Sequence, residues 1–155
     1  RRRRPAGRTP IGLPGGVYGN SAEAANHLVR QPGVVVLVDG YNVAKLGWPS
    51  FALEEQRELA IVAAEDVARR FGTEIHVIFD GADVEGAVST GRRLVRVSFS
   101  PAGVLADDVL VAEVAALDDE TPVVVVTNDQ AVVAAVRAHG ANTLSSEQWL
   151  EVAGR

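Results

Sequence analysis

Two short runs of β-branched residues constrain the fold of this chain most strongly. Residues 34–38 read Val-Val-Val-Leu-Val, and residues 123–126 are four consecutive valines. Continuous apolar runs of this length are typical of strands buried on both faces, as in a parallel sheet. Both runs are far shorter than the ~20 apolar residues that a membrane-spanning helix needs. We therefore predict a parallel sheet and no membrane-spanning segment.

Strand and helix signals alternate along the rest of the chain. Further strands are predicted over residues 74–79, 94–99 and 141–144, and helices over 21–30, 51–71, 104–117 and 129–138, with a last helix from residue 145. The candidate N-caps are Asn20 or Ser21, Ser50, and Ser145 with capping-box spacing to Gln148; Gly72 and Gly140 are placed to end helices. Five strands separated mostly by helices predict a three-layer α/β domain with a mainly parallel sheet.

Composition narrows the class of protein. The chain has 155 residues, of which 47% are apolar and 23% charged, so it can bury a core and is not disordered. It has no cysteine, which excludes disulfides, thiolate zinc sites and thiol nucleophiles and fits a reducing cytoplasm. Residue 1 is Arg rather than Met, so we expect the upstream region of a longer chain to be missing.

Charge divides the chain into two parts. Residues 1–30 hold six Arg and one Glu, whereas residues 31–155 hold nine basic and nineteen acidic residues. We predict a basic N-terminal arm with a short helix over residues 1–30 and the α/β domain over residues 31–155. A basic arm on an acidic body suits a polyanion such as RNA, with little specificity.

Five aspartates are predicted to meet at one edge of the sheet. Asp39 and Asp80 directly follow the first and second strands, and Asp129 comes two residues after the end of the fourth strand. Asp107 and Asp108 lie in the first turn of the helix over 104–117. Open parallel sheets place their sites at the carboxyl ends of the strands, where the connectivity reverses.

Each aspartate also has a purely structural explanation. Asp129 alone is best explained as a helix N-cap, Asp107 and Asp108 as partners of a helix dipole, and Asp39 and Asp80 as turn formers. Together they are harder to explain, because two carboxylates 4 Å apart repel by about 4 kcal/mol at an effective dielectric constant near 20. A bound cation or a proton on one carboxylate would relieve this repulsion. All-oxygen ligands favour Mg²⁺ or Mn²⁺, one or two ions, and hydrolysis of a phosphodiester is the natural reaction.

Four motifs in this order resemble those of one protein family, from about residue 34 to residue 152. They are Val38-Asp39-Gly40-Tyr41-Asn42-Val43, Phe79-Asp80-Gly81, Ala106-Asp107-Asp108 and Thr127-Asn128-Asp129. The set is similar to the NYN domain of YacP-like proteins, a branch of the PIN-like nucleases, and looks like its actinobacterial type. The resemblance implies a sheet in the order 3-2-1-4-5 flanked by helices, with Asp39 and Asp129 on neighbouring strands.

The resemblance also implies an activity and its residues. Family members cleave RNA with Mg²⁺ or Mn²⁺ and leave a 5′-phosphate and a 3′-hydroxyl. The candidate catalytic residues are Asp39, Asn42, Asp107, Asp108 and Asp129. The implied metal ligands are Asp39, Asp108 and Asp129, with Asp80 as a further candidate. We therefore predict a metal-dependent endonuclease for single-stranded RNA.

RNA contacts are predicted beside these acids. Tyr41 and Lys45 follow Asp39, and Arg92 and Arg93 precede the third strand. A packed aromatic ring and a solvated charge pair are the structural alternatives for Tyr41 and for the two arginines. Because the body is acidic, binding to free RNA should be weak and salt-sensitive, and recruitment by another domain or by the ribosome is expected.

Three other functions are alternatives to a metal-dependent nuclease, and the chain could also form a homodimer. A non-catalytic RNA-binding or scaffold module would keep the fold without turnover. Metal-free cleavage would need His27, His76 and His139 together, and a small-molecule phosphatase would need phosphate-loop or second-aspartate motifs that the sequence lacks. The apolar stripe Val132, Val133 and Val136 fits either a homodimer interface or the core.

Overall fold

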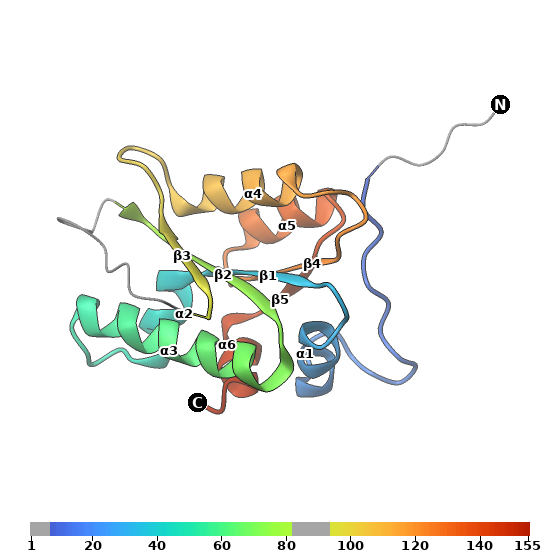
Figure 1. Cartoon of the computed structure of the whole chain (residues 1–155), viewed down its shortest axis with the longest axis horizontal. Coiled ribbons are helices and arrows are strands. Elements are labelled where there is room, and N and C mark those ends of the chain that lie inside the picture. The colour runs from blue at the N-terminus through green and yellow to red at the C-terminus, as the bar shows by residue number, and fades with distance from the viewer. Residues whose placement is uncertain (1–6, 82–93) are drawn as a thin grey trace.

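The computed structural model describes residues 7–81 and 94–155 (Figure 1). The helices are α1 (Ala22–Val29), α2 (Gly40–Gly47), α3 (Leu53–Phe71), α4 (Ala106–Ala116), α5 (Gln130–Ala138) and α6 (Ser146–Val152). The strands are β1 (Val35–Asp39), β2 (Glu74–Phe79), β3 (Arg96–Phe99), β4 (Val123–Val126) and β5 (Asn142–Leu144). In the described ranges, no helix is both long and apolar enough to cross a bilayer.

The five strands form one sheet in the order β3-β2-β1-β4-β5, and every neighbouring pair is parallel. This confirms the predicted order and the predicted α/β class. Asp39 is the last residue of β1 and lies opposite Ile78 of β2, while Val38 lies opposite Val126 of β4. The carboxyl ends of β1, β2 and β4 therefore meet at the point where the strand order reverses.

Helices cover both faces of the sheet, which gives three layers (Figure 1). α4 and α5 lie on one face, and α1, α2, α3 and α6 lie on the other. Alternate residues of each strand serve the two faces: Val36 and Val38 belong to the larger core, whereas Val35 and Leu37 belong to the core beneath α4 and α5. Because both faces are covered, the central strands are apolar at nearly every position, as the valine runs predicted.

The local signals at helix ends were mostly confirmed. Ser21 caps α1, Ser145 and Gln148 form a capping box at α6, and Gly72 ends α3 with a positive φ of 68°. The prediction for Ser50 was wrong, because α3 begins at Leu53 after Ala52, whose side chain cannot cap it.

Helix α2 is the main element that sequence reasoning missed. It begins at Gly40, directly after β1, where the sequence had indicated a turn. A Cβ atom at residue 40 would lie 2.4 Å from the ring of Phe79, so only glycine lets this helix start so close to β2. The packing of β2 against the first turn, rather than helix propensity, thus sets the start of α2.

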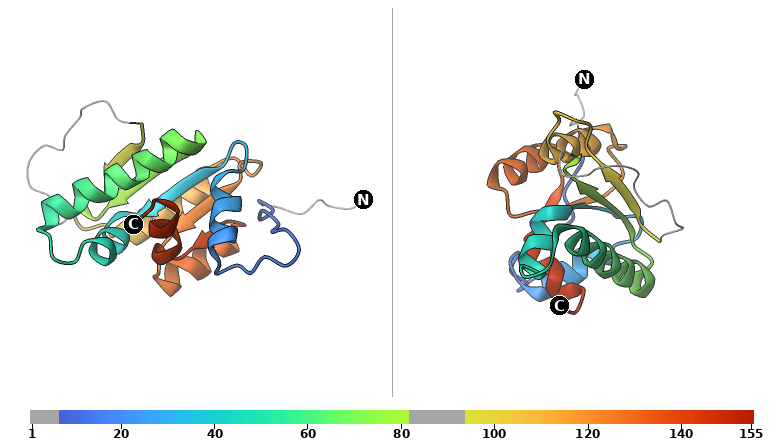
Figure 2. Two further views of the ribbon diagram at one scale, coloured as in Figure 1. Left: turned by 90° about the horizontal axis from the view of Figure 1, so that it is seen from below. Right: turned by 90° about the vertical axis from the view of Figure 1, so that its left-hand side faces the viewer.

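The described part of the predicted arm packs against the body. Figure 2 shows residues 7–20 running beside α1 along one end of the sheet. Ile11 exchanges two hydrogen bonds with the side chain of Asn142, and the Nε2 of Gln148 donates to the carbonyls of Gly19 and Ser21. Residues 7–30, which include the predicted short helix as α1, therefore pack against the α/β body.

Arg8 shows why this segment is held so firmly. Its side chain is buried and donates to five backbone carbonyls: those of Thr121, His139, Val114, Leu117 and Asp118. These carbonyls lie at or just beyond the carboxyl-terminal ends of α4 and α5, where the helix dipoles favour a positive charge. Arg8 is therefore a structural residue and is not available to a polyanion.

Candidate active site

A pocket of about 390 Å³ lies at the carboxyl ends of β1, β2 and β4. Its lining residues are Asp39, Tyr41, Asn42, Lys45, Asp80, Leu105, Ala106, Asp107 and Asp129. We call it the carboxylate pocket. Four of the five predicted aspartates line it, from four separate parts of the chain. The fifth, Asp108, is solvent-exposed and does not line it.

Thr127 fixes the distance between Asp39 and Asp129. Its hydroxyl donates to Asp39 Oδ2 at 2.7 Å and accepts from the backbone N–H of Asp129 at 3.0 Å. Asp39 Oδ2 and Asp129 N therefore lie no further apart than these two hydrogen bonds placed end to end. The neighbouring positions of β1 and β4 thus bring the two aspartates together, as the predicted strand order requires.

Burial makes Asp39 unusual for a carboxylate. It is only 7% exposed, and this desolvation raises its pKa from 3.8 to about 6. The hydrogen bond from Thr127 opposes the shift, while the negative charges of Asp107 and Asp129 add to it. The ionised form of Asp39 is therefore disfavoured by burial and by repulsion from Asp107 and Asp129, and a cation nearby would relieve that repulsion.

Asp107 and Asp129 form a close carboxylate pair. Desolvation raises the pKa of Asp107, and the charge of Asp129 and a hydrogen bond between the two side chains raise it further. Asp108 and Asp80 add smaller repulsions. A proton shared by two carboxylates occupies the position that a divalent ion takes between acidic ligands.

Asp129 is also the N-cap of α5. Its Oδ1 accepts from the N–H groups of Ala131 and Val132 at 2.9 and 3.2 Å. The capping explanation is therefore confirmed, and it does not exclude a second role, because Oδ2 is left outside the cap. The cap holds the carboxylate in one rotamer at the edge of the pocket.

Asn42 holds three elements together. Its Oδ1 accepts from the N–H of Asn128 at 3.0 Å and from the hydroxyl of Ser146 at 2.6 Å. Asn128 in turn accepts from the N–H of Ser146 and donates to Glu147. This network joins α2, the loop before α5 and the start of α6, and it holds the backbone that carries Asp129.

Tyr41 and Lys45 lie at the wall and rim of the pocket. The ring of Tyr41 is 8% exposed, packs against Phe79 at 4.9 Å between centroids, and accepts a hydrogen bond from Arg57 at 3.1 Å. This is the packed role that was the structural alternative to base stacking. The Nζ of Lys45 lies 5.5 Å from the same ring, and Lys45 is exposed, so its ammonium group is available to a phosphate.

Other predicted residues lie elsewhere. Arg92 and Arg93 are outside the described residues. The three histidines have separate surroundings: His27 contacts Gly12, His76 contacts Ser98 inside the sheet, and the carbonyl of His139 accepts from Arg8. The structure therefore does not assemble the metal-free mechanism. Of the valine stripe, Val132 and Val136 are buried in the core beneath α4 and α5, and Val133 is 9% exposed.

Thr127 and Ser146 are the residues of the site that sequence reasoning missed. Thr127 belongs to a recognised motif, but its hydroxyl had no assigned role. Thr127 directly follows β4, the strand that pairs with β1, so its position beside Asp39 could have predicted the hydrogen bond. Ser146 had no such signal, because its contact with Asn42 spans 104 residues of chain.

The oxygen ligands suit magnesium or manganese in chemical type. Within residues 7–81 and 94–155, however, no group of three or more Asp, Glu or His side chains is arranged to hold a metal ion. Mg²⁺ is commonly bound by one or two carboxylates, with waters and substrate phosphates completing its shell. The pair Asp107 and Asp129, with Asp39 beside it, fits that minimal arrangement.

The fold and the pocket together define the class of protein. An all-parallel sheet in this order, with acids at its switch point, fits the PIN-like nuclease fold of YacP-like NYN domains, and this supports a nuclease or RNA-related role. The YacP-like NYN domain matches residues 36–153, so the chain belongs to the YacP-like NYN domain family.

Two crystal structures of Rae1 (YacP) from Bacillus subtilis resemble this chain. One is 26% identical, with a TM-score of 0.67, and the match covers 77% of this chain and 73% of that chain. The other, of a single-site mutant, is 24% identical, with a TM-score of 0.65 and coverage of 77% and 74%. None of the curated proteins matches this chain.

Proposed function

We propose that this chain is a metal-dependent endoribonuclease that hydrolyses phosphodiester bonds in single-stranded RNA and leaves a 5′-phosphate. The observation that carries the proposal is the convergence of Asp39, Asp107 and Asp129 in one pocket, where their mutual repulsion favours a divalent cation. The family and its nuclease fold support the same reaction class.

The residues of the pocket have distinct roles in this proposal. Asp107 and Asp129 would hold one or two Mg²⁺ or Mn²⁺ ions, with Asp39 beside them and Asp80 at the edge. A bound ion of this kind supplies a hydroxide-like water and neutralises the phosphate. Thr127 orients Asp39, and the cap of α5 orients Asp129. Asn42 positions the loop that carries Asp129, and Lys45 offers a positive charge at the rim.

The decisive experiment is a cleavage assay with defined ends. End-labelled single-stranded RNA is incubated with the protein in Mn²⁺, in Mg²⁺ and in EDTA, and the products are sequenced at both ends. We expect cleavage that depends on the metal and is abolished by Asp39→Asn. Asp66→Asn on the surface of α3 is the matched control and should cleave normally. Cleavage that survives exhaustive chelation, or a cyclic-phosphate product, would contradict the proposal.

A non-catalytic RNA-binding module is the second candidate. Its support is the lack of a three-residue metal arrangement among the described side chains. Metal titration followed by the cleavage assay separates the two, because this candidate binds RNA and cleaves none of it.

We also propose how and where the enzyme meets RNA. The acidic body, with nine basic and nineteen acidic residues over 31–155, would bind free RNA weakly. Recruitment by the ribosome or by another domain would compensate. The absence of cysteine fits the cytoplasm as the site of this activity.

A further inference from the structure

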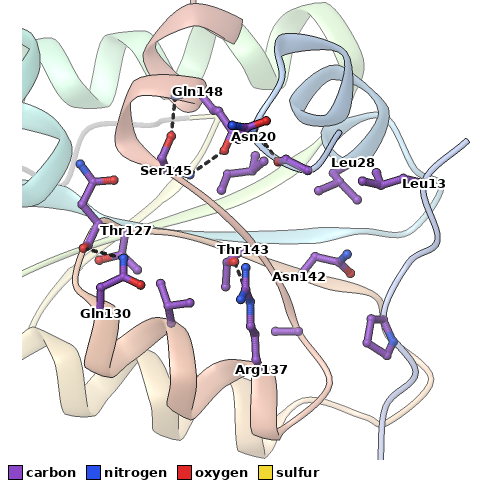
Figure 3. A pocket seen from close by; sticks show the side chains of 16 residues that line it. Leu13, Asn20, Leu28, Thr127, Gln130, Arg137, Asn142, Thr143, Ser145 and Gln148 are labelled. Carbon is purple, nitrogen blue, oxygen red and sulfur yellow. Dashed lines mark hydrogen bonds between the residues drawn. The ribbon is translucent and has the colours of Figure 1, made fainter. Parts of the chain in front are cut away.

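A second pocket lies beside the carboxylate pocket. It is an open pocket with a volume of about 630 Å³ and is lined by residues 10–20, α5, β5 and the start of α6 (Figure 3). We call it the arm pocket. Thr127 and Asn128 line it, while Asp129, the next residue, lines the carboxylate pocket. One loop therefore forms the boundary between the two pockets.

The wall made by the N-terminal segment is firmly attached. Arg8, Asn142 and Gln148 hold it through the backbone hydrogen bonds described above. This wall lies outside residues 36–153, the part that matches the family, so the pocket depends on a segment that the family domain does not include.

The charge of the arm pocket is opposite to that of its neighbour. Among the described residues, Arg137 is the only charged one that lines it, in a body with an excess of ten acidic groups. Its Nε donates to Thr143 Oγ1 at 3.2 Å, which directs the side chain across β5 (Figure 3). In the part of the chain that the structure describes, nothing accepts from its Nη groups, so they are available to a phosphate.

The rest of the lining suits a flat aromatic base. Leu28, Val133 and Leu144 form an apolar floor and are each less than 10% exposed. Asn20 and Gln130 lie on the lining, and the Oε1 of Gln130 makes no hydrogen bond within the described ranges. An apolar floor with a few polar groups is typical of pockets for small aromatic ligands, and the volume lies in their usual range of roughly 300–1,000 Å³.

We infer that the arm pocket binds an unpaired nucleotide of the RNA that flanks the cleaved bond. The base lies on the apolar floor, and its phosphate contacts Arg137. This inference rests on the proposed function for its biological role, and its binding test does not need catalysis. A strand that occupies both pockets crosses the loop of Thr127 and Asn128.

The first test measures nucleotide binding without metal. The protein carrying Asp39→Asn is titrated in EDTA with each of the four ribonucleoside 5′-monophosphates and with inorganic phosphate, while backbone amide NMR shifts are followed. We expect shifts at Asn20, Thr143 and Leu144 that saturate with a nucleotide and are weaker with phosphate alone. Arg137→Gln should weaken binding roughly tenfold, the loss of one charge-assisted contact. Arg69→Gln, exposed on α3, is the matched control and should leave binding unchanged.

The second test uses cleavage. Arg137→Gln should raise KM for a long single-stranded RNA and alter the choice of cleavage site, whereas Arg69→Gln should change neither. Nucleotide-induced shifts confined to the carboxylate pocket, equal shifts with phosphate alone, or binding unaffected by Arg137→Gln would overturn the inference. Saturable binding in the arm pocket by a protein that cleaves no RNA would instead overturn the proposed function and leave the pocket assignment standing.

Discussion

At the scale of single residues, the hydroxyl of Thr127 connects the two acids on which the proposed chemistry depends. It donates to Asp39 and accepts from the backbone of Asp129, so it orients both without adding a positive charge. Asp39 remains buried and close to like charges, and its pKa rises to about 6. The ionised carboxylate of Asp39 is therefore destabilised in the metal-free protein and stabilised when a cation binds beside it.

The first prediction concerns the stability of the metal-free protein. The folded state raises the pKa of Asp39 above its ordinary 3.8, so it binds the proton more tightly than the unfolded chain does. This contribution is complete below about pH 4 and is lost as the pH rises through about 6. Asp39→Asn should therefore increase the free energy of unfolding at pH 7 by at most about 3 kcal/mol, with no gain at pH 4.

Urea unfolding in EDTA at both pH values measures this difference. Asp66→Asn, half-buried on α3, controls for the loss of one charge. A variant at residue 39 that is less stable than the original chain at pH 7 would show that repulsion and burial do not dominate there.

The second prediction separates two adjacent aspartates. Asp107 lines the carboxylate pocket beside Asp129, whereas Asp108 is exposed and outside the lining. We expect Asp107→Asn to lower kcat for RNA by about 100-fold or more, the loss of a group that acts on the reacting charge, and Asp108→Asn to lower it much less. Steady-state cleavage by the two variants decides this. The family resemblance had indicated Asp108 as a metal ligand, so the reverse order of effects would support that prediction instead.

At the scale of the elements, Asn42 determines how α2, α6 and the loop before α5 fit together. Its Oδ1 accepts two hydrogen bonds from residues that are 86 and 104 positions away in sequence. Gly40 and Gly81 allow close approaches to Phe79 and Ser100, since a Cβ atom at residue 81 would lie 1.9 Å from the carbonyl oxygen of Ser100. The motif residues around the pocket are thus structural as well as chemical.

The third prediction tests this structural role. Asn42→Ala removes the acceptor and leaves two donors without a partner, which should lower the free energy of unfolding by about 1–3 kcal/mol. Asn26→Ala is a matched control, because Asn26 bonds only within α1. Thermal unfolding measured by circular dichroism should show a clear loss for residue 42 and little for residue 26. Equal melting temperatures for the two variants would contradict the role.

At the scale of the whole molecule, the N-terminal segment is part of the fold rather than an appendage. Arg8 is 7% exposed and joins this segment to the ends of α4 and α5 through five backbone carbonyls. The segment then passes the arm pocket and leads into α1.

The fourth prediction follows from this anchor. Arg8→Ala removes the side-chain donor to five backbone carbonyls, most of them part-buried, and should destabilise the protein by about 2–4 kcal/mol. Arg69→Ala on the exposed face of α3 should cost less than about 1 kcal/mol. Urea denaturation compares the two directly. If Arg8→Ala were as mild as the control, the segment would not be an integral part of the domain.

Local sequence patterns predicted the strands and helix ends correctly where the structure depends mainly on residues close together in the chain. The valine runs predicted β1 and β4, and side-chain oxygens and glycine at helix ends predicted the caps of α1 and α6 and the end of α3. These features depend on residues close together in sequence. Helix α2 was missed because its start depends on Phe79, nearly forty residues away.

The sequence by itself determined the class of the fold, the strand order through its family motifs, and the acids that gather at the switch point. Only the tertiary structure decided that Asp107 rather than Asp108 faces the pocket, that Tyr41 is packed, and that Arg8 is buried. Backbone propensity and hydrophobic periodicity are local properties, so they can be read along the chain. The direction and burial of a side chain depend on elements packed against it from distant segments, and these are known only once the chain has folded.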